Sequence, residues 1–191
     1  MSIRAFIAIE LDEPVRRGLA DLEEDLKRSG AEVKWVKPAN LHLTLKFLGQ
    51  VEEDAVSRVS GIMEEAVEGV APFGLRIAGA GSFPRGRRPR VVWVAAHEAG
   101  STLEAIHRRL EKGLSSVGVA PDGRRFVAHV TLGRVRSGRR SERLADDIDR
   151  AAEREFGEVT VDALTLFEST LTPTGPIYTA IGRASLGREG E

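Results

Sequence analysis

Apolar residues along the chain either alternate with polar ones or recur every three to four positions, and this pattern predicts mixed α and β structure. Residues 3–9 alternate loosely and are rich in β-branched side chains, which is typical of a strand. Residues 15–26 carry an apolar stripe at helical spacing, and Gly30 is a stop signal. The rest of this half predicts extended segments over 33–36 and 41–48, a helix with an acidic start that covers about 52–67, and a strand over 73–80.

The second half of the chain repeats this plan. A strand over 90–95 precedes a helix in which Ser101 and Glu104 have the spacing of a capping box. Gly118 ends that helix. The remaining pattern predicts an extended segment over 126–135, a helix over 141–154 and strands over 159–167 and 177–184.

Two histidines occupy equivalent positions in these halves. His42 lies 12 residues after Gly30, and His129 lies 11 residues after Gly118. Each opens the same short pattern, His-Leu-Thr-Leu in the first half and His-Val-Thr-Leu in the second. Two copies of one strand–helix–strand unit would pack about a pseudo-twofold axis, so that equivalent residues face each other across a groove.

We therefore expect an α+β fold in which residues 1–191 form a single bilobal domain. Its two pseudo-symmetric halves, about 1–85 and 86–191, are each predicted to be an antiparallel sheet with two helices, with a cleft between them.

Strand geometry predicts which side chains reach that cleft. Because side chains alternate faces with a period of two, His42, Thr44 and Lys46 are predicted to face the cleft. The apolar residues between and after them, including Phe47, are predicted to face the core. The same alternation in residues 129–132 delivers a second imidazole and a second hydroxyl to the same space.

Paired imidazoles and hydroxyls suit phosphoryl chemistry. Hydrolysis of a cyclic phosphodiester removes a proton from water and gives one to the departing ribose oxygen, and one histidine of each copy suits these roles near neutral pH. The hydroxyls of Thr44 and Thr131 suit donation to the non-bridging oxygens. We expect no metal and no cofactor, because the paired histidines lack an acidic partner at ligand spacing. The remaining histidines, His97 and His107, are interpreted as structural.

Composition restricts location and partners. Hydrophobic residues make up 41% and charged residues 30%, as in ordinary globular proteins. The absence of cysteine excludes disulfides, and no apolar run is long enough for a membrane span or a signal peptide, so we expect a cytoplasmic protein with no membrane partner. The net charge of −1 argues against coating nucleic acid by bulk charge, although arginines cluster at 85–90, 124–125 and 134–140.

The two motifs resemble the twin His-x-Thr-x signature of the 2H phosphoesterase superfamily. Further segments are similar, in order along nearly the whole chain, to bacterial and archaeal RNA 2′,3′-cyclic phosphodiesterases, also called 2′-5′ RNA ligases. These segments are RAFIAI at 4–9, Trp35-Val36, LHLTLKFLG at 41–49, GSFP at 81–84, RVVWV at 90–94, residues 126–134, Glu168-Ser169 and Tyr178. One departure is Ala128, where relatives commonly carry proline, and it concerns entry into the strand more than chemistry.

The resemblance implies a bilobal α+β fold and hydrolysis of RNA 2′,3′-cyclic phosphate ends to 2′-phosphates. It also implies a reverse-type reaction that joins such an end to a 5′-hydroxyl through a 2′-5′ linkage. His42 would be the proton donor and His129 the proton acceptor. The expected partner is RNA with a 2′,3′-cyclic phosphate end, tRNA-like fragments included, and the expected oligomeric state is a monomer.

Two basic residues are candidates for binding the phosphate. Strand parity places Lys46 on the cleft face. The same parity places Arg134 on the face opposite His129, and a bulge at Gly133 would re-aim it.

Two further candidates lie beside the strands. Phe126 suits stacking on a base, with core packing as the alternative. Arg90 ends the arginine run 85–90, which is either a loop that grips the RNA backbone or a solvated hairpin. Two other functions stay open at this point: a cyclic phosphodiesterase acting on a small nucleotide, and an RNA-end-binding module without turnover.

Overall fold

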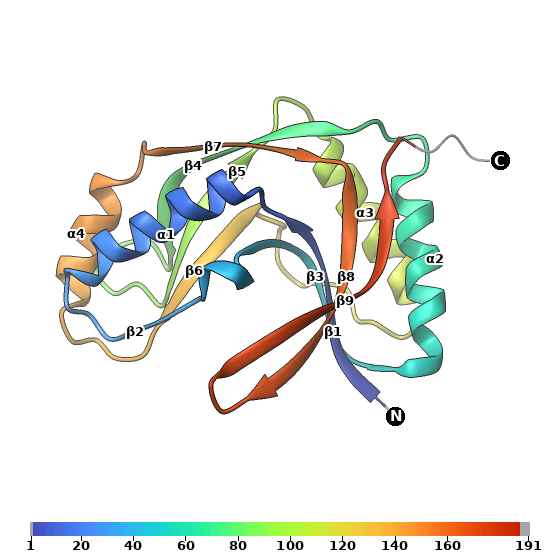
Figure 1. Ribbon diagram of the computed structural model, residues 1–191, viewed down its shortest axis with the longest axis horizontal. Helices are drawn as coiled ribbons and strands as arrows, with labels where there is room; N and C mark the ends of the chain where they lie inside the picture. Colours follow the sequence, from blue (N-terminus) through green and yellow to red (C-terminus); the bar gives the residue numbers. More distant parts are fainter. Residues whose placement is uncertain (1, 188–191) are drawn as a thin grey trace.

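The computed structural model describes residues 2–187 and shows one curled antiparallel sheet with helices packed against it (Figure 1). The strands are β1 (Ser2–Glu10), β2 (Val33–Trp35), β3 (His42–Glu52), β4 (Phe73–Phe83), β5 (Val91–His97), β6 (His129–Val135), β7 (Glu155–Val161), β8 (Ala163–Thr172) and β9 (Gly175–Ser185). The helices are α1 (Glu13–Lys27), α2 (Val56–Val67), α3 (Thr102–Ser115) and α4 (Ser141–Arg150), with 3-10 turns η1 (Pro38–Asn40) and η2 (Glu53–Ala55). The α+β fold class is confirmed.

The sheet is symmetric about its centre. Its strand order is β7-β4-β5-β6-β3-β1-β8-β9, with β2 added to β6. At the centre, β3 and β6 run antiparallel and pair through Leu43 and Val130. The strands on one side of the centre are, going outward, β6, β5 and β4, and those on the other side are β3, β1 and β8. Strands at the same distance from the centre have equivalent places in the two repeats. A pseudo-twofold axis therefore passes between the two strands that begin with His42 and His129.

The two repeats exchange elements between the lobes. The first-half strand β4 lies beside β5, because residues 84–90 connect the two strands as antiparallel neighbours. Helix α1 packs on β7 and touches α4, while α2 packs against α3 and β9 (Figure 1). We expected each half to form its own sheet with its own two helices. Instead, one sheet runs through both lobes, and each lobe combines strands and helices of both halves.

The predicted strand over 159–167 is divided in the structure. β7 ends at Val161, where it pairs with β4 at one edge of the sheet, and β8 begins at Ala163 and pairs with β1. Asp162 therefore lies where the chain passes from one lobe to the other. A run of alternating apolar residues does not reveal such a break, since both strands keep the same period of two.

The apolar patterns that predicted the elements form the core. The stripe of α1 is buried, with Leu19 and Leu22 at most 1% exposed. In β1, residues 5–9 are all buried, which means that both faces of this central strand are covered and explains its loose alternation. Among residues 2–187, no helix combines the length and the apolar character needed to cross a bilayer.

The predicted capping box of α3 is wrong. Ser101 is the N-cap residue but makes no side-chain cap hydrogen bond. The backbone N–H groups of Thr102 and Leu103 instead donate to the two carboxylate oxygens of Glu98, at 2.9 and 2.8 Å. A carboxylate accepts both bonds at once and carries a charge that favours the positive end of the helix, so it is the stronger cap.

Candidate active site

The first histidine is held by its own strand entry. The imidazole Nδ1 of His42 lies 2.7 Å from the backbone oxygen of Asn40, which ends the turn η1. Because a carbonyl only accepts, Nδ1 carries the proton, which leaves Nε2 for chemistry. The ring stacks on Phe6 at 4.7 Å and meets Tyr178 edge-on at 5.4 Å. Burial lowers the pKa of His42, and the hydrogen bond to Asn40 opposes that effect.

The second histidine repeats this arrangement. The Nδ1 of His129 lies 2.7 Å from the backbone oxygen of Val127, again two residues earlier. Its neighbours are aromatic edges, with Phe83 at 5.4 Å and Trp93 at 6.1 Å. Both motifs therefore orient the ring with a local backbone carbonyl and leave Nε2 outside that hydrogen bond.

The register of β3 and β6 gives the two motifs a common face. Leu43 and Val130 pair directly, and both are fully buried. Because adjacent residues of a strand point to opposite faces, His42 and Thr44 lie on the face away from the core. Residues 129 and 131 lie on that same face of the neighbouring strand, and all four side chains are half-buried. Two imidazoles and two hydroxyls thus lie on one face of this strand pair.

Both motifs end in a bulge at the same position. In the β1–β3 ladder, Ile7 pairs with Lys46 and Ala8 with Thr44, so Leu45 is an extra residue. In the β5–β6 ladder, Val92 pairs with Gly133 and the next residue, Trp93, pairs with Thr131, so Leu132 is an extra residue. A bulge adds one residue to one strand and reverses the parity of every side chain that follows.

The prediction that Lys46 faces the cleft is wrong. After the bulge, Leu45 and Lys46 are both buried, and Phe47 becomes 59% exposed although we expected it in the core. The Lys46 side chain is 1% exposed and its ammonium lies 2.6 Å from Glu111 and 3.0 Å from Asp122. It also donates to the backbone oxygen of Ala120 at 2.9 Å. The ammonium is therefore committed to internal partners and is not a phosphate ligand.

The equivalent bulge moves Arg134 in the opposite direction, from the core face to the cleft face. Its side chain is exposed, and its charge, with that of Arg4, opposes the rise that burial causes in the pKa of Tyr178. Tyr178 in turn contacts His42, so Arg134 lies on the side of the sheet that carries the histidines. Only glycine fits at position 133, just before Arg134, because a Cβ there would lie 2.7 Å from the Val33 side chain.

The other two binding candidates are held by contacts outside the two His-x-Thr-x motifs. Phe126 is half-buried and stacks on His107 at 4.2 Å, so its ring packs within the protein. Arg90 holds the start of β5 through its backbone, which donates to the Phe83 oxygen and accepts from the Val135 N–H. The Arg90 side chain is exposed at the end of the arginine run.

Sequence reasoning missed the aromatic walls of the site. Phe6 pairs with Phe47 in the ladder and contacts the rings of both His42 and Tyr178. Phe83 stands beside His129 and packs on Trp93. Tyr178 had entered only through the resemblance. The sequence does place an aromatic residue near the first motif in both β1 and β3, namely Phe6 and Phe47. Which face these rings occupy depends on the bulge at Leu45, which the sequence does not reveal.

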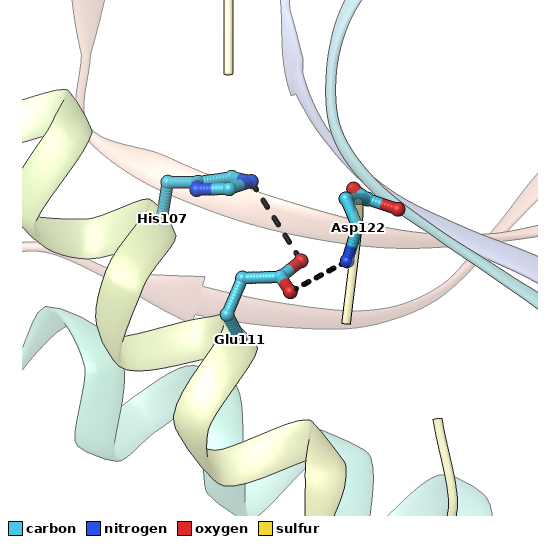
Figure 2. Close-up of side chains that lie close together, drawn as sticks. All are labelled: His107, Glu111 and Asp122. Atoms are coloured by element: carbon cyan, nitrogen blue, oxygen red, sulfur yellow. Dashed lines mark hydrogen bonds and ion pairs between the residues drawn. The ribbon is translucent and has the colours of Figure 1, made fainter. Parts of the chain in front are cut away.

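One group among residues 2–187 has the donor atoms of a metal site: His107, Glu111 and Asp122 (Figure 2). The Lys46 ammonium already lies at ion-pair distance from both carboxylates. A lysine there supplies the positive charge that a metal would supply, and it would repel a second cation. These residues therefore do not fit a resident metal ion.

This fold and the twin motifs define a two-repeat phosphoesterase architecture, and comparison with known proteins gives the family. The model of the LigT-like phosphoesterases matches residues 9–93 and 94–178, so the chain belongs to that family. An RNA 2′,3′-cyclic phosphodiesterase of Methanothermobacter thermautotrophicus is 40% identical and covers 94% of this chain and 96% of its own. A protein of the same name from Thermotoga maritima is 37% identical and covers 92% of this chain and 91% of its own.

Solved structures agree with this assignment. A Thermus thermophilus protein superimposes with a TM-score of 0.79 at 29% identity, over 96% of this chain and 98% of its own. E. coli LigT in complex with 3′-AMP superimposes with a TM-score of 0.76 at 25% identity, over 98% of this chain and 100% of its own.

Proposed function

We propose that this protein hydrolyses RNA 2′,3′-cyclic phosphate ends to 2′-phosphates, and that it needs no metal to do so. The observation that carries the proposal is the pairing of Leu43 with Val130, which sets two imidazoles and two hydroxyls on one face. Each imidazole is held through Nδ1 by the backbone carbonyl two residues earlier. The names of the relatives, RNA 2′,3′-cyclic phosphodiesterases, support the substrate class.

The proposed reaction uses one histidine on each side of the phosphorus. Nε2 of His129 takes a proton from water as the water oxygen bonds to phosphorus. The bond between phosphorus and the ribose 3′-oxygen breaks, and His42 gives that oxygen its Nε2 proton. The products are a 3′-hydroxyl and a 2′-phosphate. Attack by a 5′-hydroxyl in place of water would give the 2′-5′ linkage of the ligase reaction.

Three other groups stabilise the transition state in this proposal. The hydroxyls of Thr44 and Thr131 donate to the non-bridging oxygens, where negative charge accumulates. The Arg134 guanidinium provides a positive charge on the same face. Both threonines stand on strands, so their positions are fixed before the substrate binds.

The lowered pKa of His42 fits a proton donor that becomes protonated only when its substrate binds. Burial disfavours the charged form of its imidazole in the free protein and so lowers its pKa. A cyclic phosphodiester carries one negative charge, and an anion beside an imidazole raises its pKa. In this proposal, His42 therefore takes up its proton when the phosphate binds and delivers it to the leaving oxygen.

A direct assay tests the proposal. The chelator-treated protein is incubated with a short RNA that ends in a 2′,3′-cyclic phosphate, and the product is digested and analysed for the position of the phosphate. We expect the phosphate on the 2′-oxygen. A 3′-phosphate product, or activity only after a divalent metal is restored, would contradict the proposal.

A further inference from the structure

The buried lysine of the first motif is tied to the chain segment that leads into the second motif. Lys46 lies on β3, four residues after His42. Its ammonium contacts the carboxylates of Glu111 and Asp122 and the backbone oxygen of Ala120. Glu111 belongs to α3, while 120 and 122 lie in the irregular segment 116–128 that precedes β6. One side chain thus joins three parts of the fold.

Three more contacts strengthen this junction. The backbone N–H of Asp122 donates to the second carboxylate oxygen of Glu111 at 2.9 Å (Figure 2). One turn earlier on α3, His107 lies 3.8 Å from Glu111 and stacks on Phe126 at 4.2 Å. The segment is therefore held at 120–122 by Lys46 and Glu111 and again at 126 by His107.

The segment held in this way orients a catalytic ring. Val127 follows Phe126, and its carbonyl accepts the Nδ1 proton of His129 at 2.7 Å. Any displacement of the segment moves this carbonyl and frees the ring to rotate or to change tautomer. The first motif is built differently, because Asn40 lies in η1 and is anchored by its side chain to the backbone oxygen of Pro176 at 3.0 Å.

We propose that Lys46 is a positioning residue: it clamps segment 116–128 so that the Val127 carbonyl keeps the His129 ring in the Nδ1-protonated orientation, with Nε2 free for the substrate. The kinetic part of this inference rests on the proposed role of His129, whereas the structural part does not. Burial of a lysine between two carboxylates is costly unless all its donors are satisfied, and here three acceptors surround it.

The test replaces the clamp and observes the ring directly. In Lys46→Met, ring ¹⁵N NMR of His129 at pH 8 should show a mixture of tautomers, whereas the wild type should show Nδ1–H alone. Because misplacement of a catalytic group by about 1 Å lowers rates by up to about 10²-fold, kcat should fall roughly 10- to 100-fold. KM should change less than about threefold, since the substrate contacts remain.

Lys27→Met is the matched control. Lys27 is the same residue type and forms an exposed ion pair with Glu24 on α1. It should leave the ring spectrum and kcat unchanged. If Lys46→Met does not fold, Asp122→Asn replaces it, because Asp122 is half-exposed and the substitution removes one of the two negative charges that the Lys46 ammonium pairs with. Asp122→Asn should shift the same ring signals in the same direction by a smaller amount.

Each outcome decides one of the two claims. A His129 ring spectrum identical to that of the wild type, in a folded variant with broken clamp contacts, overturns the clamp whatever the activity. A changed ring spectrum with unchanged kcat supports the clamp and refutes the proposed catalytic role of His129. A changed spectrum with reduced kcat supports both.

Discussion

His42 lies among three aromatic rings, those of Phe6, Phe167 and Tyr178, whereas His129 lies edge-on to Phe83 and Trp93. The strand plan of the two motifs is the same, including the local carbonyl that holds each Nδ1. Enclosure lowers the pKa of His42 through loss of solvation. A duplicated unit thus supplies two imidazoles, and their different surroundings provide the asymmetry that the proposed acid and base roles require.

The residues after the two bulges differ as well. In the first repeat, position 46 holds the buried lysine and position 47 an exposed phenylalanine. In the second repeat, the equivalent positions hold Gly133, under β2, and the exposed Arg134. Each repeat therefore contributes something the other lacks: an internal clamp in one, a cationic side chain on the active face in the other.

The largest expected effect comes from removing either imidazole. His42→Ala and His129→Ala should each lower kcat by on the order of 10²- to 10⁴-fold, the usual range for acid–base catalysis. The double variant should lose little more than either single variant, because the two residues act as a unit. His97→Ala is the control, since His97 ends β5 and its ring contacts the backbone oxygen of Ala78 on β4. Independent, multiplicative losses in steady-state assays would contradict the paired mechanism.

The second comparison concerns Arg134. A hydrogen bond to a charged group contributes roughly 1.5–3 kcal/mol, so Arg134→Met should lower kcat/KM by about 10- to 100-fold. Arg183→Met removes a guanidinium that pairs with Asp162 on the surface, and its kcat/KM should stay within about twofold of the wild type. Equal effects of the two substitutions would place Arg134 outside the site.

The arginine loop between β4 and β5 follows Phe83, whose ring contacts His129, and it should favour long substrates. Arg87 already pairs with Glu142 at 3.0 Å, while Arg85 and Arg88 have exposed side chains. Replacing Arg85 and Arg88 by glutamine should raise KM for an oligonucleotide severalfold and leave KM for a mononucleotide cyclic phosphate unchanged. The salt dependence should weaken by a slope of about 0.7 for each lost phosphate contact.

A remote arginine and the choice of substrate control that experiment. Arg17, on the exposed face of α1, serves as the matched substitution to glutamine. If the loop variant and Arg17→Gln behave alike, the loop is a solvated hairpin. If the wild type turns over a mononucleotide as well as an oligonucleotide, the small-nucleotide function would replace the RNA function.

The smallest expected change is a shift in the pKa of His42. In the free protein, NMR titration of the His42 ring should give a pKa below the ordinary histidine value, because burial disfavours its charged form. Saturation with adenosine 2′-phosphate should raise that pKa, since the bound anion favours the charged form. A pKa at or above the ordinary value in the free protein would remove the basis for substrate-linked protonation.

Much of the protein can be predicted from residue order alone. The twin motifs, their spacing from helix-ending glycines and the apolar stripes predicted the element order, the α+β class and a pseudo-twofold relation between halves. These features depend on local periodicity, which is written into neighbouring residues. The same reasoning placed His42 and Thr44 on one face, because no bulge interrupts that pair.

Tertiary structure decided the rest. The bulge at Leu45 exists only relative to the partner strand β1, so the burial of Lys46 and the exposure of Phe47 could not follow from alternation. The exchange of β4 and β8 between lobes likewise depends on which edges pair. Charges that meet from distant segments, such as Lys46 with Glu111, acquire their role only through contact. Local periodicity determines which faces a segment has, whereas long-range pairing determines what each face meets.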